Sequence, residues 1–355
     1  MSNRLKWLVA LVFLAFVIAI PQFVRNSYYM HLMILVMMNS VLAMTFILVL
    51  RTGLINMSVA AFWGIGAYSS GMLAAKAGLS FWVALPASLA IAALVGLIIG
   101  VVLVRNAGLG FVIPSLLFAF IVPLIFGTFS VFGGYVGLIG IPAPSTIPLP
   151  FGGHLVFGSE RSYYYLLLVF AIVVVIAFLA LYRAWTGRAW RALGLSSDLA
   201  ESVGISPFRY RLLAFVIASV AAALMGIFFA QYSTNIAPDS YGPFKAIYVQ
   251  MYAILGGVGS PIVGPLIGAG ILTLIPEALR VTGGFAPILV GALIILILVF
   301  LPQGVLGFFR GRTFRDIPEE ILLALGRGRA SQGGGPKSVP KVEAELLVRQ
   351  PKDEL

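Results

Sequence analysis

TGRAWRALGLSSDLAESVGISPFRYR, residues 186–211, is the longest polar stretch between two strongly apolar runs of this 355-residue chain. The apolar runs on either side, 163–182 and 212–232, have the length and composition of transmembrane helices. A connection between two such helices needs only a few residues, so this stretch has room for structure of its own. Pro207 fits the first turn of a helix, where no N–H partner is needed, and predicts where the second helix begins.

A short helix is predicted inside this polar stretch, over Ser197–Val203. Ser196 or Ser197 can cap it, and Asp198 lies in its first turn, where the helix dipole favours a negative charge. Gly204 can end it, because glycine readily adopts the left-handed conformation that closes many helices. Two roles fit such a helix: it rests on the lipid surface, or it docks into a soluble partner.

The composition excludes a soluble globular fold. Hydrophobic residues make up 61% of the chain, charged residues make up 10%, and the mean hydropathy is +1.06. A soluble core could not bury that much apolar surface, so we predict an all-α polytopic membrane protein. The chain has no cysteine, which excludes disulfides, thiol catalysis and cysteine-bound metals.

Ten apolar runs predict about ten transmembrane helices. Several runs are short or broken by glycine and proline, and such breaks belong inside a bundle, because irregular backbone is not stable against lipid. The predicted spans are residues 7–20, 29–50, 54–75, 81–104, 111–129, 163–182, 212–232, 244–255, 262–279 and 286–301.

The basic residues predict the orientation of these spans. With the N-terminus inside, ten spans place both termini in the cytoplasm, together with 18 of the 23 lysines and arginines. The net charge of +11 is therefore a topology signal and not a nucleic-acid footprint. On this topology 186–211 is cytoplasmic and the loop 130–162 faces outside. The basic residues assigned to the outer side are Arg25, Lys76, Arg161, Lys245 and Arg280.

The chain divides into three predicted segments. Residues 1–28 hold an N-terminal transmembrane helix and an outer loop, 29–311 form the main transmembrane domain, and 312–355 form a flexible, poorly ordered cytoplasmic tail. The last residues, 352–355, spell KDEL, a luminal retention signal. A cytoplasmic end cannot meet a luminal receptor, so we interpret this match as chance.

The chain lacks the groups that drive transport or catalysis in other protein classes. None of its 12 acidic residues falls near the centre of a predicted span, where ion-coupled transporters keep ionisable groups. Glu277 comes closest, with Arg280 as its expected partner. His31 and His154 have no neighbours suited to a metal site and are expected to be structural. Catalytic triads, HExxH and GxxxxGK[ST] motifs are also missing, so we expect no enzymatic activity, metal or cofactor.

Small residues predict close helix packing in three spans. Two of these spans each carry a pair of glycines at GxxxG spacing, and the glycine-rich third span is expected to be a crowded central helix. These residues are Gly96, Gly100, Gly264 and Gly268 for the pairs, and Gly53, Gly64, Gly66 and Gly71 in or beside the third span.

The third span also carries uncharged polar groups. Asn56 and Ser58 lie towards its inner end, and Tyr68, Ser69 and Ser70 lie towards its outer end. Unsatisfied polar groups are costly in hydrocarbon, so this helix is not expected to face lipid. It lines a central passage, or its polar groups bond to neighbouring helices, and the sequence leaves both open.

Several motifs, in the same order along the chain, resemble the permeases of branched-chain amino acid ABC transporters. Residues 187–226 look like the coupling loop and following helix of that family. GLINMSVAAFWGIGAY at 53–68 is similar to its third-span motif, and FGGYVGLIGIPAP at 132–144 is similar to its outer-loop motif. The similarity is nearly continuous over 236–280, and LPQGVLG at 301–307 closes it.

The resemblance implies a bundle of the vitamin B12-importer-like, type II ABC permease kind, in the bacterial inner membrane. It implies a heterodimer with a second permease, two ATPase subunits and a periplasmic solute-binding protein, and this chain looks like the longer permease. The solute-binding protein is expected on the outer loops 130–162 and 233–243. The ATPase is expected to grip the short helix, with Asp198, Ala200, Glu201 and Gly204 as the coupling residues.

Four positions depart from the family motifs and leave the solute open. Val59 stands where the family usually has histidine, and Ser58 where it often has glycine. Phe120 replaces a glutamate and Pro123 a basic residue. We therefore expect a permease for branched-chain amino acids or related small polar solutes such as amides, urea or carboxylates. The alternatives are a gradient-driven secondary transporter or channel, and a membrane-embedded enzyme; the missing carboxylates and catalytic motifs count against both.

Overall fold

The computed structural model describes residues 15, 17–23, 26–144, 147–148, 154–155, 159–279, 291–292, 295 and 304–309. All of them belong to one compact unit, Met1–Arg312. The predicted spans 7–20 and 286–301 lie largely outside the described residues. The predicted tail, 312–355, lies wholly outside them.

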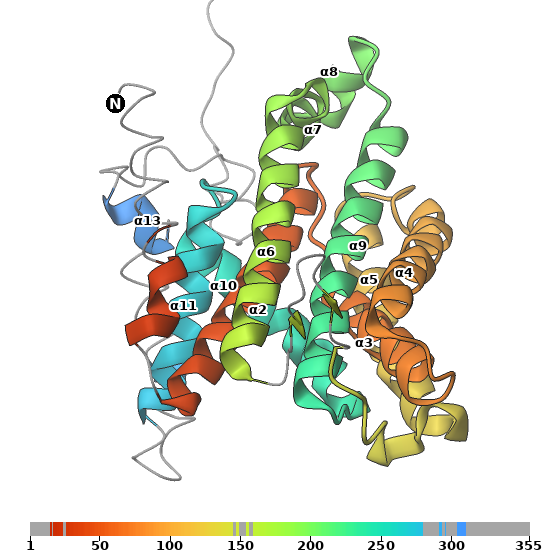
Figure 1. The fold of residues 1–355 in the computed structure, drawn as a ribbon. Coiled ribbons are helices and arrows are strands. Elements are labelled where there is room, and N and C mark those ends of the chain that lie inside the picture. Colours follow the sequence, from red (N-terminus) through yellow and green to blue (C-terminus); the bar gives the residue numbers. More distant parts are fainter. Residues whose placement is uncertain are drawn as a thin grey trace, which may run out of the picture. The chain divides into compact units, whose positions relative to one another are not determined.

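Helices form almost all of the described regular structure (Figure 1). The α-helices are α2 (Ser27–Leu50), α3 (Val59–Ala75), α4 (Phe81–Leu103), α5 (Leu109–Thr128), α6 (Glu160–Arg183), α7 (Trp185–Leu195), α8 (Ser197–Ser202), α9 (Pro207–Ser233), α10 (Pro243–Gly256), α11 (Val263–Leu279) and α13 (Gly304–Phe309). The 3-10 helices are η1 (Ser130–Phe132), η2 (Gly134–Val136) and η3 (Pro238–Tyr241). Two residues of β1 (Ile147–Pro148) pair antiparallel with β2 (His154–Leu155).

The all-α polytopic membrane fold is confirmed. Within the described residues, 5 helices are long and apolar enough to cross a membrane, namely α2, α4, α5, α6 and α9, and α3 and α11 are shorter apolar helices. In the most apolar 18-residue segment of each helix, 78% of the residues are buried in α2 and 67% in α9, whereas 22% are buried in α4 and 28% in α5. Helices α2 and α9 are therefore central, and α4 and α5 leave most of their surface open to lipid.

The third predicted span begins later than the sequence suggested. We predicted 54–75, and the helix starts at Val59 after an irregular segment. Gly53 has a positive φ of 81°, which ends the preceding turn. Asn56 then turns the chain, because its side-chain oxygen accepts hydrogen bonds from both the backbone N–H (2.9 Å) and the hydroxyl (2.6 Å) of Ser58. Such local bonds compete with helix formation, and they explain the late start.

Glycines bring α3 and α9 into backbone contact, as predicted for a crowded central helix. A Cβ on Gly66 would overlap the backbone of Ala223 in α9, and a Cβ on Gly226 would overlap the carbonyl oxygen of Trp63 in α3. Thirteen of the 17 residues of α3 are buried. The GxxxG prediction for α11 is also confirmed, since a Cβ on Gly268 would overlap the carbonyl oxygen of Tyr252 in α10.

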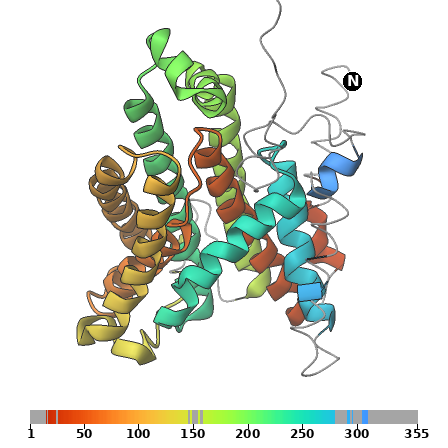
Figure 2. The same cartoon turned by 180° about the vertical axis from the view of Figure 1, so that it is seen from behind.

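The connection between α9 and α10 dips into the bundle. Tyr241 in η3 is 0% exposed, and its ring lies 4.8 Å from the Trp63 ring and 5.8 Å from the Tyr68 ring, both in α3. A backbone bridge between Leu138 and Ile236 ties this connection to the loop after α5. Helix α10 runs across the face of the bundle that Figure 2 presents, and α6 covers the opposite face in Figure 1. The first turn of α10 therefore starts inside the bundle.

Candidate functional site

The polar stretch 186–211 folds into two helices, α7 and α8, at one end of the bundle, called here the α8 end (Figure 1). The prediction of a single short helix is wrong in missing α7. The predicted helix itself is found as α8, one residue shorter than expected. The Ser196 hydroxyl caps it by accepting a hydrogen bond from the N–H of Leu199 at 3.3 Å, and Asp198 lies in its first turn.

The end of α8 is a glycine-closed turn, as predicted. Gly204 has a φ of +85°, and its N–H donates to the carbonyl oxygen of Glu201 at 2.9 Å. The N–H of Ile205 donates to the carbonyl oxygen of Ala200 at 3.0 Å. These two bonds form a Schellman motif, which needs a left-handed residue at the position of Gly204.

Helix α7 fixes the stretch to the bundle through Trp190. This side chain is 0% exposed, its indole N–H donates to the carbonyl oxygen of Tyr210 at 2.9 Å, and its ring lies 6.3 Å from the Tyr182 ring. Gly187 packs against the backbone of Tyr182. The sequence did carry a signal for α7, because Trp190 and Leu193 lie on one face of a helix. We read the whole stretch as polar and overlooked that face.

The α7–α8 stretch also contacts the connection between α2 and α3. The Arg211 side chain donates through Nε to the carbonyl oxygen of Thr52 at 3.3 Å, and Gly194 packs against the backbone of Arg51. The Arg51 guanidinium lies over the Tyr182 ring, 4.8 Å from its centroid. Burial lowers the pKa of Arg51 from its ordinary value, and the ring face is a favourable neighbour for the cation. These contacts join the stretch to the segment that leads into α3.

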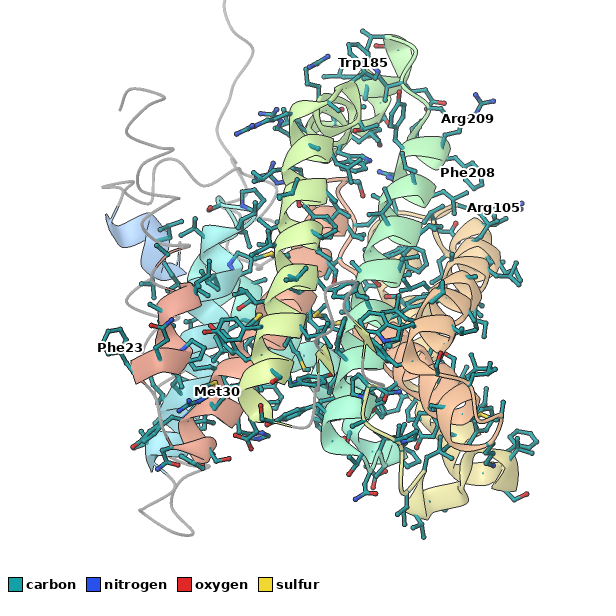
Figure 3. The ribbon with its side chains drawn as sticks, viewed as in Figure 1. Phe23, Met30, Arg105, Trp185, Phe208 and Arg209 are labelled. Atoms are coloured by element: carbon teal, nitrogen blue, oxygen red, sulfur yellow. The ribbon has the colours of Figure 1, made fainter. Side chains whose placement is uncertain are left out.

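The last residue of α7, helix α8 and its C-cap expose apolar side chains at the α8 end. Leu195, Leu199 and Val203 are 69%, 71% and 73% exposed. Figure 3 shows Trp185, Phe208 and Arg209 at the same end, with Arg105 at the nearby end of α4. An exposed apolar group on a rigid base is suited to binding a protein partner.

The predicted coupling residues fall into two groups. Asp198, Glu201 and Gly204 are exposed on α8 and the turn that follows, whereas Ala200 is 2% exposed. Ala200 therefore packs α8 onto the bundle and can act on a partner only through α8. The coupling role of these residues stays a prediction.

The predicted pathway residues lie inside the chain with hydrogen bonds of their own. Asn56, Ser58 and Tyr68 are 2%, 0% and 1% exposed, and Ser69 is half-buried. Asn56 and Ser58 bond to each other, the Tyr68 hydroxyl donates to the carbonyl oxygen of Ile236 at 3.5 Å, and the Ser69 hydroxyl donates to the carbonyl oxygen of Gly66 at 3.2 Å. Their role in a passage stays a prediction.

A cysteine scan from Gly53 to Ala75 tests that role, because the chain has no native cysteine to interfere. If the helix lines a passage, water-soluble thiol reagents are expected to label it every three to four residues, with ATP altering the pattern. Half-buried Ser69 is expected to be labelled first. Uniform protection along the segment would place α3 away from the passage.

Lys245 is the charged residue that the sequence reasoning misplaced. We assigned it to the outer side, and the structure places it half-buried in the first turn of α10, where its Nζ donates to the Asn39 Oδ1 at 2.9 Å. The predicted span 244–255 already placed Lys245 in a helix, and the contact with Asn39 of α2 is what the sequence did not show. No group of three or more His, Asp or Glu residues suited to a metal occurs in the part of the chain that the structure describes.

The structure describes only some of the other charged residues and histidines for which the sequence predicts a partner or a structural role. Arg280 lies outside the described residues, and Glu277 accepts a hydrogen bond from the hydroxyl of Tyr28. The His31 ring nitrogen Nδ1 lies 2.8 Å from the Tyr232 hydroxyl and its ring stacks on that of Tyr232, which fits the structural role we expected. The His154 side chain is outside the described part.

Known proteins resemble this chain over most of its length. A family model for the permease component of the branched-chain amino acid transport system matches residues 28–302. LivM, the high-affinity branched-chain amino acid transport system permease protein of Salmonella typhimurium, is 30% identical over 277 residues, which cover 73% of this chain and 65% of LivM. The chain therefore spans slightly less than two thirds of the length of that relative.

Two further relatives carry different names. LivH, a high-affinity branched-chain amino acid transport system permease protein of Escherichia coli, is 32% identical over 184 residues, covering 49% of this chain and 59% of LivH. LsrD, the autoinducer 2 import system permease protein of Yersinia pseudotuberculosis, is 27% identical over 282 residues, covering 73% of this chain and 78% of LsrD. No solved structure matches the chain significantly.

Proposed function

Because the chain belongs to the family of branched-chain amino acid transport system permease components, we propose that it is the permease subunit of an ABC importer. In this role it carries a small polar solute across the bacterial inner membrane and does not itself hydrolyse ATP. Branched-chain amino acids are the first candidate solutes, since LivM and LivH are named for them. LsrD is named for a different solute, so family membership leaves the solute open.

One observation supports this function best: the α7–α8 stretch presents exposed apolar side chains on an anchored base. An importer needs such a surface to receive movement from an ATPase, whereas a channel or a gradient-driven transporter works without one. The exposed Leu195, Leu199 and Val203 are the side chains that an ATPase cleft would cover. The buried Trp190 holds their base in place.

The orientation follows from the same assignment. The α8 end is cytoplasmic, with both termini on that side, and the connections after α5 and α9 face the periplasm. The proposed partners are a second permease, two ATPase subunits and a periplasmic solute-binding protein. The resemblance to both LivM and LivH supports a heterodimer, because those names describe two different permeases.

The proposal is tested by uptake into proteoliposomes that hold the full complex. Labelled leucine is expected to accumulate only when ATP is inside the vesicles and solute-binding protein is outside. In such vesicles the α8 end and the ATPase face the interior. Accumulation that needs only a proton or sodium gradient would favour the secondary-transporter alternative and contradict the proposal.

The outer loops are expected to bind the solute-binding protein. Val131, Tyr135, Val136 and Ile139 are 56%, 71%, 71% and 66% exposed beside the bridge that ties the two outer connections together. A photoreactive group at Tyr135 is expected to crosslink to the binding protein, and one at Leu94, which is 59% exposed on α4, is not. Full-rate uptake without any binding protein would contradict delivery through these loops.

A further inference from the structure

Lys245 lies deep in the bundle. Its partner Asn39 is the middle of α2, 12 residues from Ser27 and 11 from Leu50. At 1.5 Å per residue, Asn39 is roughly 17 Å from either end of that helix. The ammonium group of Lys245 therefore lies about half-way along a membrane-spanning helix, where a charge is costly and is usually functional.

This cation has no carboxylate partner among the described residues. Its contacts are the Asn39 oxygen at 2.9 Å and the faces of two rings, Trp63 at 4.8 Å and Tyr252 at 5.8 Å from Nζ to the centroid. The Asn39 amide is oriented by Thr273, because its Nδ2 donates to the Thr273 hydroxyl at 3.1 Å. An ammonium group has three donors, so Lys245 retains the capacity to bind an anion.

Two further donors beside Lys245 are buried and unpaired within the described part of the chain. The Trp63 indole N–H and the Tyr241 hydroxyl have no hydrogen-bond partner there, and these residues are 4% and 0% exposed. Their rings lie 4.8 Å apart, and the Trp63 ring is the one that Lys245 covers. Buried polar groups without partners are rare, and each one calls for an explanation. A bound acceptor group would satisfy them.

The cluster is open on one side. Lys245 is only half-buried, and its neighbours on the outer face of α10, Phe244 and Tyr248, are 77% and 44% exposed. Figure 2 shows α10 on the face of the bundle that no other described helix covers. A passage between this chain and a second permease would therefore have Lys245 on its wall.

We propose that Lys245, with Asn39, Trp63 and Tyr241, forms an anion-recognition site that binds the carboxylate of the transported solute half-way through the membrane. This inference rests on the proposed importer function and narrows its solute. A cation with no carboxylate partner, in one cluster with two unpaired donors, suits an amino acid or another carboxylate, and it gives no advantage to neutral amides or urea.

A lysine with a purely structural role, joining α2, α3 and α10, would have the same contacts. The test must therefore measure whether bound solute protects Lys245. The assembled complex in nanodiscs is treated with a water-soluble acetylating reagent, and acetylation of Lys245 is followed by mass spectrometry. Lys76 is the internal control, since it is exposed and lies in the connection after α3. Leucine and leucinamide are the two probes; both carry the amine that consumes reagent, and only leucine has the carboxylate.

With 10 mM leucine and a Kd on the order of 1 mM, acetylation of Lys245 is expected to slow about tenfold, relative to Lys76. Leucinamide is expected to leave both rates unchanged. The proposal is overturned if leucine has no effect, if leucinamide protects equally, or if Lys245 is acetylated in neither the ATP-bound nor the nucleotide-free state. This readout does not require transport, so it separates failure of the site from failure of the importer function.

Uptake by variants completes the test. Lys245→Met is expected to lower ATP-driven leucine uptake about tenfold or more, Lys245→Arg to retain most of it, and Lys76→Met to behave as wild type. Assembly is expected in all three, and basal ATP hydrolysis is expected to be unchanged in Lys76→Met. Normal uptake by Lys245→Met, in a complex whose wild type transports leucine, would contradict the proposal, and so would a Lys245→Met complex that fails to assemble.

Discussion

Gly226→Val is expected to prevent α3 and α9 from packing, with a loss of at least about tenfold in correctly assembled complex. The added Cβ would overlap the carbonyl oxygen of Trp63, a backbone atom that no side-chain rotation can move. Overpacking a core typically costs about 1–3 kcal/mol when side chains can adjust, and here two helix axes must separate. Assembled complex in the membrane, measured by size-exclusion chromatography after extraction, reports the effect.

Gly270→Ala is the matched control. Gly270 is a helical glycine in α11, and a Cβ there meets nothing within 4 Å. Its replacement is expected to be neutral or slightly stabilising, since alanine favours helix over glycine. Equal yields from Gly226→Val and Gly270→Ala would show that the α3–α9 contact does not hold the bundle together.

Gly204→Val is expected to uncouple ATP hydrolysis from uptake while leaving assembly intact. A Cβ on Gly204 meets nothing within 4 Å, so the expected effect does not come from crowding. It comes from φ of +85°, a conformation that costs roughly 1–2 kcal/mol for a residue with a side chain. The Schellman turn is expected to open and shift α8, and solute taken up per ATP hydrolysed is expected to fall about tenfold.

Two other glycines provide controls for backbone strain. Gly78 and Gly108 have φ of 65° and 58°, and a Cβ on either meets nothing within 4 Å. Gly78→Val strains the connection between α3 and α4. Gly108→Val strains the α4–α5 connection, near Arg105 at the α8 end (Figure 3). Both variants are expected to keep their coupling ratio; if Gly204→Val also keeps it, α8 is not the coupling element.

The features of this fold that could be predicted are those that residues adjacent in the sequence determine. Apolar run length determined the membrane class, and the serine cap and terminal glycine located α8 to within one residue, because helix ends are governed by a few adjacent residues. The positive φ of Gly204 followed from the same local rule.

The parts that could not be predicted depend on distant contacts. Trp190 is buried because Tyr182 and Tyr210 meet it in space, and nothing in α7 alone requires this. The depth of Lys245 depends on where the connection after α9 enters the bundle, and hydropathy does not report that. The predicted span 244–255 already contained Lys245, but nothing in the local sequence shows that its side chain reaches Asn39 in the middle of α2.

Helix α10 has a consequence for how the protein is made. At 14 residues it is about 21 Å long, short of the roughly 30 Å hydrocarbon layer, and the lysine in its first turn adds to the cost of insertion from the translocon. The Lys245–Asn39–Thr273 chain of hydrogen bonds offsets that cost only when all three segments are present. Asn39 is synthesised long before Lys245, but Thr273 follows it by 28 residues, or about 1–6 s at common rates of synthesis. During that interval α10 lacks one of the contacts that offset this cost, so we expect α10 and α11 to be retained in the bilayer together.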